Sequence, residues 1–282
     1  MRLSPTGRSR NLEDRRGARV RPMGIGIGGL LIALVVGYCT GINPLALLGV
    51  ANQVQQAAPP GDQTAPITDE AEEPMVRFLS GVLDDAQAVW AEEFSRAQIP
   101  YREAKLVLFR DLTRTACGYG EAASGPFYCP GDEKVFIDLG FYEELRTRFG
   151  APGDFAQAYV LAHEIGHHIQ RLTGTEEQVR GAQRSSPGAA NQLSVAMELQ
   201  ADCYAGIWGH SAAARGLLEP GDIEEGLGAA AAVGDDRLQR AQTGTVNPDA
   251  FTHGTSEQRM RWFRQGFDSG NSDLCNPFEG MQ

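Results

Sequence analysis

Residues 163–167 read His163-Glu164-Ile165-Gly166-His167 and lie inside an apolar run with a helical pattern. On a helix, residues four apart lie about 6 Å along the axis and about 40° apart in angle, so both imidazoles reach one ion from the same face. Glu164 follows the first histidine and can act as general base toward a water at the metal. Three of the chain's five histidines fall within six residues here, which disfavours the alternative of two solvated histidines on an ordinary helix. The stretch therefore predicts a helix that holds a catalytic metal.

A second acidic pair, Glu198 and Asp202, has the spacing of neighbours on one helical face. A catalytic zinc commonly takes three protein ligands and leaves the fourth position for water or substrate. Glu198 can be the third ligand. Asp202 can accept the free ring N–H of a ligating histidine and so fix its tautomer. Alone, the pair also fits an ordinary surface helix, but together with His163 and His167 it predicts a Zn²⁺ site.

The bulk composition restricts the class of partner. The chain has 282 residues, enough for one large domain or two small ones, and 42% of them are apolar. Its formal charge is −11, unevenly distributed: residues 1–23 contain seven Arg against two acidic residues, and the remainder contains 18 basic and 34 acidic residues. An acidic body argues against a nucleic-acid partner, which would need a basic face.

Residues 24–50 form a stretch of 27 residues without a charged side chain. That length spans a bilayer, and the Arg-rich residues 1–23 before it predict an arm in the cytoplasm and a body outside it. A cleaved signal peptide has a similar layout, but the apolar run is long for one and no small-residue cleavage site precedes the polar stretch. Cys39 follows Tyr38, where a lipoprotein site would have a small residue. We expect an uncleaved, single-pass transmembrane anchor.

Four cysteines lie beyond the anchor, and an even count outside the cytoplasm fits two disulfides. Cys117 with Cys129 would close a short Gly-rich loop, which leaves Cys203 to be linked with Cys275. The alternative is a second, cysteine-rich metal site, for which the chain lacks the C-x-x-C spacing.

The pattern after the anchor predicts a disordered tether over residues 51–73 and a folded body over residues 74–282. Either of two expected strands, 104–109 and 135–139, could line a cleft and pair with an extended peptide. The polar residues 175–190 predict a mobile rim of that cleft. The expected helices are 74 to about 98, 154–172 with Asp154 and Gln157 as a capping box, 192–210, 222–241 and 256–266. The fold class is therefore α+β, a helix-rich body with a small β-sheet, preceded by one transmembrane helix.

Taken together, these motifs resemble the bacterial putative neutral zinc metallopeptidase family, and the match runs nearly end to end. It rests on the runs NLEDRRG (11–17), GPFYCP (125–130), AYVLAHEIGHHIQ (158–170), ELQADC (198–203), GDDR (234–237) and FTHGTSEQR (251–259). The family looks like a branch of the gluzincins, whose zinc is held by two His and one Glu. The resemblance implies a gluzincin-like body with metallopeptidase activity on a peptide or protein substrate. Together with the anchor predicted from residues 24–50, it predicts a single-pass protein of the bacterial cell membrane.

The mechanism that this predicts is hydrolysis of peptide bonds by a zinc-activated water. His163, His167 and Glu198 would hold the ion, and Glu164 would take the water's proton and deliver it to the leaving amine. His253 is the candidate donor to the oxyanion, as a histidine is in some related gluzincins, and the alternative is a structural residue ahead of the final helix. Tyr159 and Tyr204 are weaker candidates.

Two neighbouring residues are expected to have structural roles. Arg259 is expected to pair with Asp235 or Asp236, and His168 to face away from the zinc, since the next helical position is rotated by about 100°. Two other functions stay open: a membrane-anchored scaffold that keeps zinc for stability, and a zinc hydrolase of a non-peptide amide such as a cell-wall bond.

Overall fold

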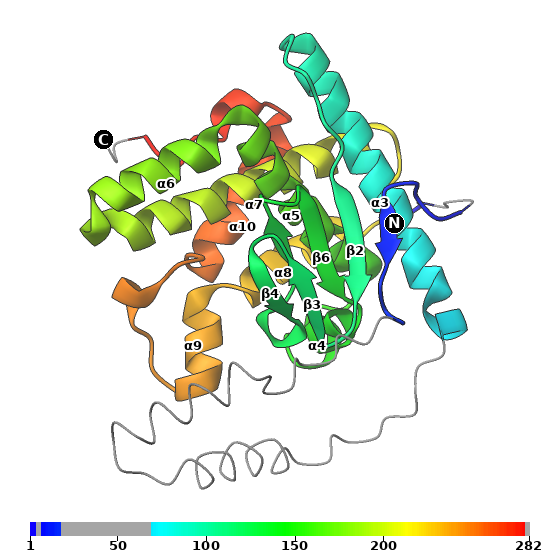
Figure 1. The fold of residues 1–282 in the computed structure, drawn as a ribbon, viewed down its shortest axis with the longest axis horizontal. Coiled ribbons are helices and arrows are strands. Elements are labelled where there is room, and N and C mark those ends of the chain that lie inside the picture. The colour runs from blue at the N-terminus through cyan, green and yellow to red at the C-terminus, as the bar shows by residue number, and fades with distance from the viewer. Residues whose placement is uncertain (4–6, 18–68, 280–282) are drawn as a thin grey trace, which may run out of the picture. The chain divides into compact units, whose positions relative to one another are not determined.

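The computed structural model describes residues 1–3, 7–17 and 69–279. The predicted anchor and almost all of the predicted tether lie outside these residues. Within the described part of the chain, no helix has the length and apolar character needed to cross a membrane. The described residues form a helix-rich α+β body, as predicted, with two small sheets where one was expected (Figure 1).

The larger sheet has the strand order β1-β2-β6-β5. Its strands are β1 (Leu12–Asp14), β2 (Lys105–Phe109), β6 (Lys134–Asp138) and β5 (Phe127–Cys129). β1, β2 and β6 run parallel, and β5 pairs antiparallel with β6. The last four residues of β2 are all buried, as expected for a strand covered on both faces. A separate hairpin pairs β3 (Leu112–Thr115) with β4 (Gly118–Glu121).

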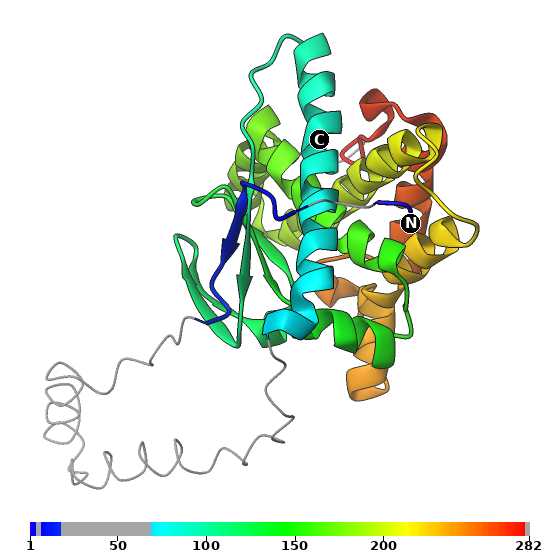
Figure 2. The same cartoon turned by 90° about the vertical axis from the view of Figure 1, so that its right-hand side faces the viewer.

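Most of the helices lie to one side of the sheet (Figure 2). They are α3 (Asp69–Arg96), α4 (Gly140–Thr147), α5 (Asp154–Thr173), α6 (Thr175–Ser185), α7 (Ala190–Ala214), α8 (Asp222–Ala232), α9 (Asp235–Thr243) and α10 (Ser256–Ser269).

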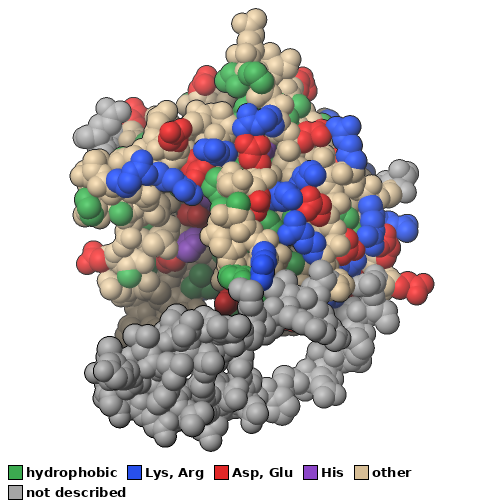
Figure 3. Space-filling view, in the orientation of Figure 1, with side chains coloured by type: hydrophobic (Ala, Val, Ile, Leu, Met, Phe, Trp, Pro, Cys, Tyr) green, Lys and Arg blue, Asp and Glu red, His purple; other side chains and the backbone are tan. Residues whose placement is uncertain are grey.

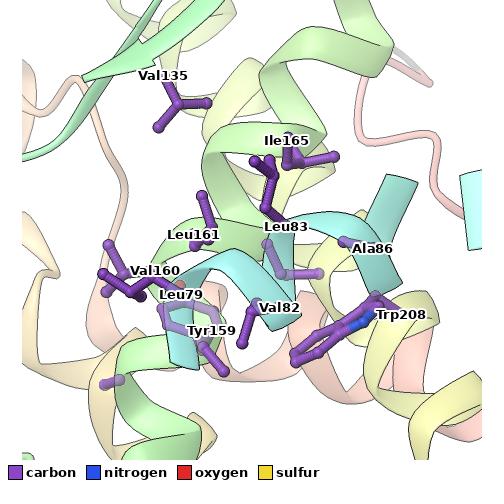
Figure 4. Close-up of a cluster of buried hydrophobic side chains, with 14 of the residues drawn as sticks. Leu79, Val82, Leu83, Ala86, Val135, Tyr159, Val160, Leu161, Ile165 and Trp208 are labelled. Carbon is purple, nitrogen blue, oxygen red and sulfur yellow. The ribbon is translucent and has the colours of Figure 1, made fainter. Parts of the chain in front are cut away.

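The core lies around α5, which is buried on nearly every side. The apolar positions of α3 recur three and four residues apart, and Leu79 and Leu83 face Leu161 and Ile165 of α5 (Figure 4). Trp208 of α7 belongs to the same cluster. A helix that is buried on nearly every side depends on its neighbours for stability, so this packing fixes the helix that carries the histidines.

Several predicted boundaries are wrong. The first helix begins at Asp69, so Pro74 lies inside it rather than at its start. The segment 222–241 is two helices, α8 and α9, separated at Val233 and Gly234. Asp154 is the first residue of α5 and caps nothing, because Gly153 is the N-cap without a side-chain hydrogen bond. The predicted mobile rim contains an ordered helix, α6.

The N-terminal arm also differs from the expectation. Met1–Ala18 and Pro74–Gln282 form one compact unit, in which Arg15 N donates to Leu108 O at 2.7 Å and Leu106 N donates to Asn11 O at 2.9 Å. Strands of one sheet must lie on the same side of any membrane. The predicted arm therefore contains a strand, β1, that pairs with β2 of the body, and the location of both relative to a membrane stays a prediction.

Candidate metal and active site

The close packing of α5 against α7 positions the candidate ligands. Gly166 lies at the contact, where a Cβ atom would be 2.9 Å from Ala201 O and 3.0 Å from Ala201 Cα. A side chain at this position would push the helices apart. The glycine within the histidine motif therefore lets α7 approach closely enough for Glu198 to lie over His163 and His167.

His163, His167 and Glu198 meet at one point, as the sequence predicted. Their nitrogen and carboxylate ligand atoms all lie within 4.8 Å of one another. Nε2 of His163 is 3.2 Å from one oxygen of Glu198, and Nε2 of His167 is 3.5 Å from the other. A tetrahedral zinc with bonds of about 2.0–2.1 Å separates its ligand atoms by about 3.3 Å. The residues present therefore fit a zinc ion with one position left for water or substrate.

The outward nitrogens of both histidines are held by hydrogen bonds. His163 Nδ1 is 2.8 Å from Asp202 Oδ1, the contact predicted from the sequence. His167 Nδ1 is 2.8 Å from Gln170 Oε1, which the sequence analysis missed, although an i,i+3 spacing on a helix could have indicated it. With each Nδ1–H donating outward, Nε2 is the nitrogen of each histidine that faces Glu198 and is left for a metal.

Arg259 does not pair with Asp235 or Asp236, and this prediction is wrong. Its Nε and Nη2 donate to the two oxygens of Asp202 at 2.8 and 2.9 Å, and all these groups are buried. The hydroxyl of Tyr159 also donates to Asp202. Asp202 is thus a carboxylate held by a guanidinium, a phenol and an imidazole. Asp235 instead accepts from the backbone of Thr252 and His253, and Asp236 accepts from Ser256 N at the start of α10.

The electrostatics of the cluster follow from burial opposed by neighbouring charges. Burial lowers the pKa of His163, but the carboxylates of Asp202 and Glu198 outweigh it and raise that pKa to about 9. Burial raises the pKa of Glu198, but His167 and His163 outweigh it and hold the pKa well below its usual range. Glu198 is therefore ionised at neutral pH, as a metal ligand must be.

Glu164 lies in the wall of a groove of about 610 Å³ that contains the three candidate ligands. Figure 3 shows histidine and acidic side chains at the bottom of this hollow. Burial raises the pKa of Glu164, against the opposing effect of His167 and His163. A carboxyl group with a raised pKa suits proton transfer near neutral pH.

His253 also lines the groove. Its Nδ1 is 3.1 Å from Asp235 Oδ1, and Asp235 in turn accepts from the backbone N–H groups of Thr252, His253 and Gly254. The hydrogen bond to Asp235 raises the pKa of His253. Among the described residues, Nε2 of His253 has no hydrogen-bond partner, so it is the ring nitrogen open to a ligand.

The wall of the groove nearest the sheet is β5, and neither expected strand takes this place. β2 and β6 are inner strands, whereas β5 is an edge strand whose Phe127 and Tyr128 line the groove. The Tyr128 hydroxyl lies 2.9 Å from His168 Nδ1, and His168 Nε2 lies 2.7 Å from Arg102 O. His168 therefore faces away from the ligand cluster, as predicted, and attaches α5 to β5.

The predicted cysteine pairs and the two tyrosines considered as oxyanion donors can also be located in the structure. Both expected disulfides form, Cys117 with Cys129 and Cys203 with Cys275. Tyr204 does not line the groove; it packs edge-on against Trp90 in the core. Tyr159 lines the groove, but its hydroxyl is engaged by Asp202.

Two histidines and a glutamate that converge in an open groove, with a second glutamate beside them, are the arrangement typical of zinc peptidases. The chain belongs to the family described as putative neutral zinc metallopeptidase, whose model matches residues 1–278. It is 47% identical over 290 residues to the uncharacterized protein YpfJ of Escherichia coli K12, covering 99% of each chain. It is 43% identical over 189 residues to the uncharacterized protein Rv2575 of Mycobacterium tuberculosis H37Rv, covering 63% of each. No solved structure matches the chain.

Proposed function

We propose that the protein is a zinc metalloendopeptidase that hydrolyses peptide bonds with a zinc-activated water. The observation that carries the proposal is the convergence of His163, His167 and Glu198 beside the buried Glu164 in one groove. Family membership supports the same activity. A structural zinc usually has four protein ligands, whereas this cluster offers three, which disfavours a scaffold that keeps zinc only for stability.

The chain's own residues supply the proton transfers. When bound, zinc would supply Lewis acidity and lower the pKa of water to about 7. Glu164 takes the proton of the attacking water and passes it to the leaving nitrogen. His253 is oriented by Asp235 and donates from Nε2 to the carbonyl oxygen as negative charge develops there. Asp202 and Gln170 keep the two ligand histidines in the tautomer that leaves Nε2 for the metal.

The groove supports an extended polypeptide as substrate. Residues of the edge strand β5 and of the C-terminal end of α4 line this groove. Residues of α6 and of the first turns of α7 line it as well. An edge strand can pair with an extended peptide through main-chain hydrogen bonds. The wall also contains Phe127, Phe141, Phe149 and Leu238, apolar surface that suits peptide side chains better than a polar sugar.

Replacement of the general base tests the function. Glu164→Gln should bind zinc as the natural chain does, yet hydrolyse an unstructured protein such as casein several orders of magnitude more slowly. Glu198→Ala is the control that should lose zinc and activity together. Cleavage by Glu164→Gln at the natural rate would contradict the mechanism. Release of cell-wall amides without casein cleavage would instead favour the hydrolase of a non-peptide bond.

A further inference from the structure

A line of buried amides connects His167 to the second disulfide. Gln170 Oε1 lies 2.8 Å from His167 Nδ1, and Gln170 Nε2 donates to Gln200 Oε1 at 3.1 Å. Gln200 Nε2 then donates to Cys275 O at 2.8 Å. Cys275 is bonded to Cys203 on α7, the helix that also carries Glu198. Gln170 and Gln200 are 0% and 6% exposed, so solvent does not compete for these hydrogen bonds.

Two backbone carbonyls fix the direction of this line. Gln170 Nε2 also donates to Met197 O at 2.7 Å, and a carbonyl can only accept, so the amide nitrogen must face α7. Gln170 Oε1 must then face His167 and accept its Nδ1–H. In the same way Cys275 O requires the nitrogen of Gln200, which turns Gln200 Oε1 toward Gln170. Both amides are therefore oriented, and their orientation leaves the lone pair of His167 on Nε2.

The two ligand histidines are thus held by different chemistry. His163 donates to a carboxylate that is paired with Arg259. His167 donates to a neutral amide whose orientation depends on residues far along the chain. An outer hydrogen bond that orients a metal ligand typically changes metal affinity by about 10- to 100-fold.

We propose that Gln170 is the positioning residue for His167, and that Gln200 and the Cys203–Cys275 disulfide hold Gln170 in its orientation. The proposal rests on the zinc site of the proposed function but not on peptide cleavage. It makes the metal affinity of the site depend on the second disulfide, whereas the first disulfide, Cys117–Cys129, has no hydrogen-bonded route to a ligand among the described residues.

The test compares full-length variants in which one buried glutamine is replaced by methionine, which has similar length and no amide. Gln87, on α3, is 2% exposed and makes no contact with a ligand, so Gln87→Met is the matched control. The measurements are the zinc dissociation constant by competition with a chromophoric chelator, the visible spectrum of the cobalt-substituted protein and the melting temperature without metal.

Gln170→Met should weaken zinc binding about 10- to 100-fold and change the cobalt spectrum. Gln200→Met should act in the same direction by a smaller factor, because Met197 O still orients Gln170. Gln87→Met should bind zinc as the natural chain does. Natural affinity and an unchanged cobalt spectrum in Gln170→Met would overturn the role of Gln170, and natural affinity in Gln200→Met alone would overturn the connection to Cys275.

The disulfides give an independent comparison. Replacing both Cys203 and Cys275 by Ser should weaken zinc binding, whereas the same change at Cys117 and Cys129 should not. If the first double variant does not fold, Gln200→Met carries the test. If the unmodified protein does not bind zinc, both the zinc site and this proposal are wrong. If it binds zinc but does not cleave peptides, only the proposed activity is wrong.

Discussion

Arg259 on α10 holds Asp202 on α7 through two hydrogen bonds of 2.8 and 2.9 Å, and Asp202 holds His163. The guanidinium is also 3.7 Å from Glu198 Oε2. One buried cation thus neutralises an acidic pair on α7, and a helix that contributes no ligand orients the metal site.

Removal of this cation should destabilise the body. Arg259→Met leaves Asp202 as a buried carboxylate without its guanidinium, and breaking a buried ion pair in this way costs about 3–5 kcal/mol. Urea denaturation of the metal-free protein measures the loss. Arg259→Met combined with Asp202→Asn should recover part of it, because no uncompensated charge remains. A loss below about 1 kcal/mol in the single variant would mean that water replaces the guanidinium.

The Gly166 contact predicts a second effect on both stability and metal binding. In Gly166→Ala the new methyl group meets the backbone of Ala201, and crowding of this kind costs about 1–3 kcal/mol. Because the strain separates α5 from α7, zinc affinity should fall together with the melting temperature. Gly181→Ala, on α6 in open surroundings, is the control. An unchanged zinc affinity in Gly166→Ala would show that the two helices can adjust.

His253 predicts a pH dependence of catalysis. Its pKa is raised above 6.5, chiefly by Asp235, so the donating, protonated form persists above pH 6.5 and is lost as pH rises through the raised value. Asp235→Asn should move the alkaline limb of the kcat profile to lower pH. His253→Ala should remove that limb and lower kcat about 100- to 1,000-fold while KM changes little. A variant with the natural kcat and a lower melting temperature would make His253 structural.

Because β1 pairs with β2, we predict that the residues around β1 and those around β2 lie in the same cellular compartment. Arg10 and Ile99 are exposed in the body, so cysteines at these positions should react alike with a membrane-impermeant maleimide in intact bacteria. The natural chain, with its own cysteines, gives the background. Labelling at position 99 in intact cells, but at position 10 only after permeabilisation, would instead support a cytoplasmic location of residues 1–23.

Long periodic segments carried most of what the sequence predicted. The apolar pattern of 154–172 and the i,i+4 spacing of Glu198 and Asp202 give α5, α7 and the ligand set, because helical geometry alone relates residues four apart. β1 and β5 were missed because each has three residues, too few for alternation to be visible.

The hydrogen bonds that Asp202 accepts from Arg259 could not be predicted from helical spacing. The pairing of Arg259 with Asp202 joins residues 57 positions apart on different helices, and the choice among three nearby aspartates depends on how α10 packs on α7. The pairing of β1 could not be predicted from the charge rule for membrane topology, for a related reason. It treats residues 1–23 as an isolated arm, whereas Leu12–Asp14 has a partner more than ninety positions away.

The same Arg259–Asp202 pair has a consequence for the order of events during synthesis. Asp202 leaves the ribosome before its guanidinium partner, and at about 5–20 residues per second the interval is about 3–11 s. During that interval, burial of Asp202 against α5 would enclose an unneutralised carboxylate. The docking of α7 should therefore wait for α10, and the candidate metal site of a nascent chain should remain unassembled until α10 has been translated.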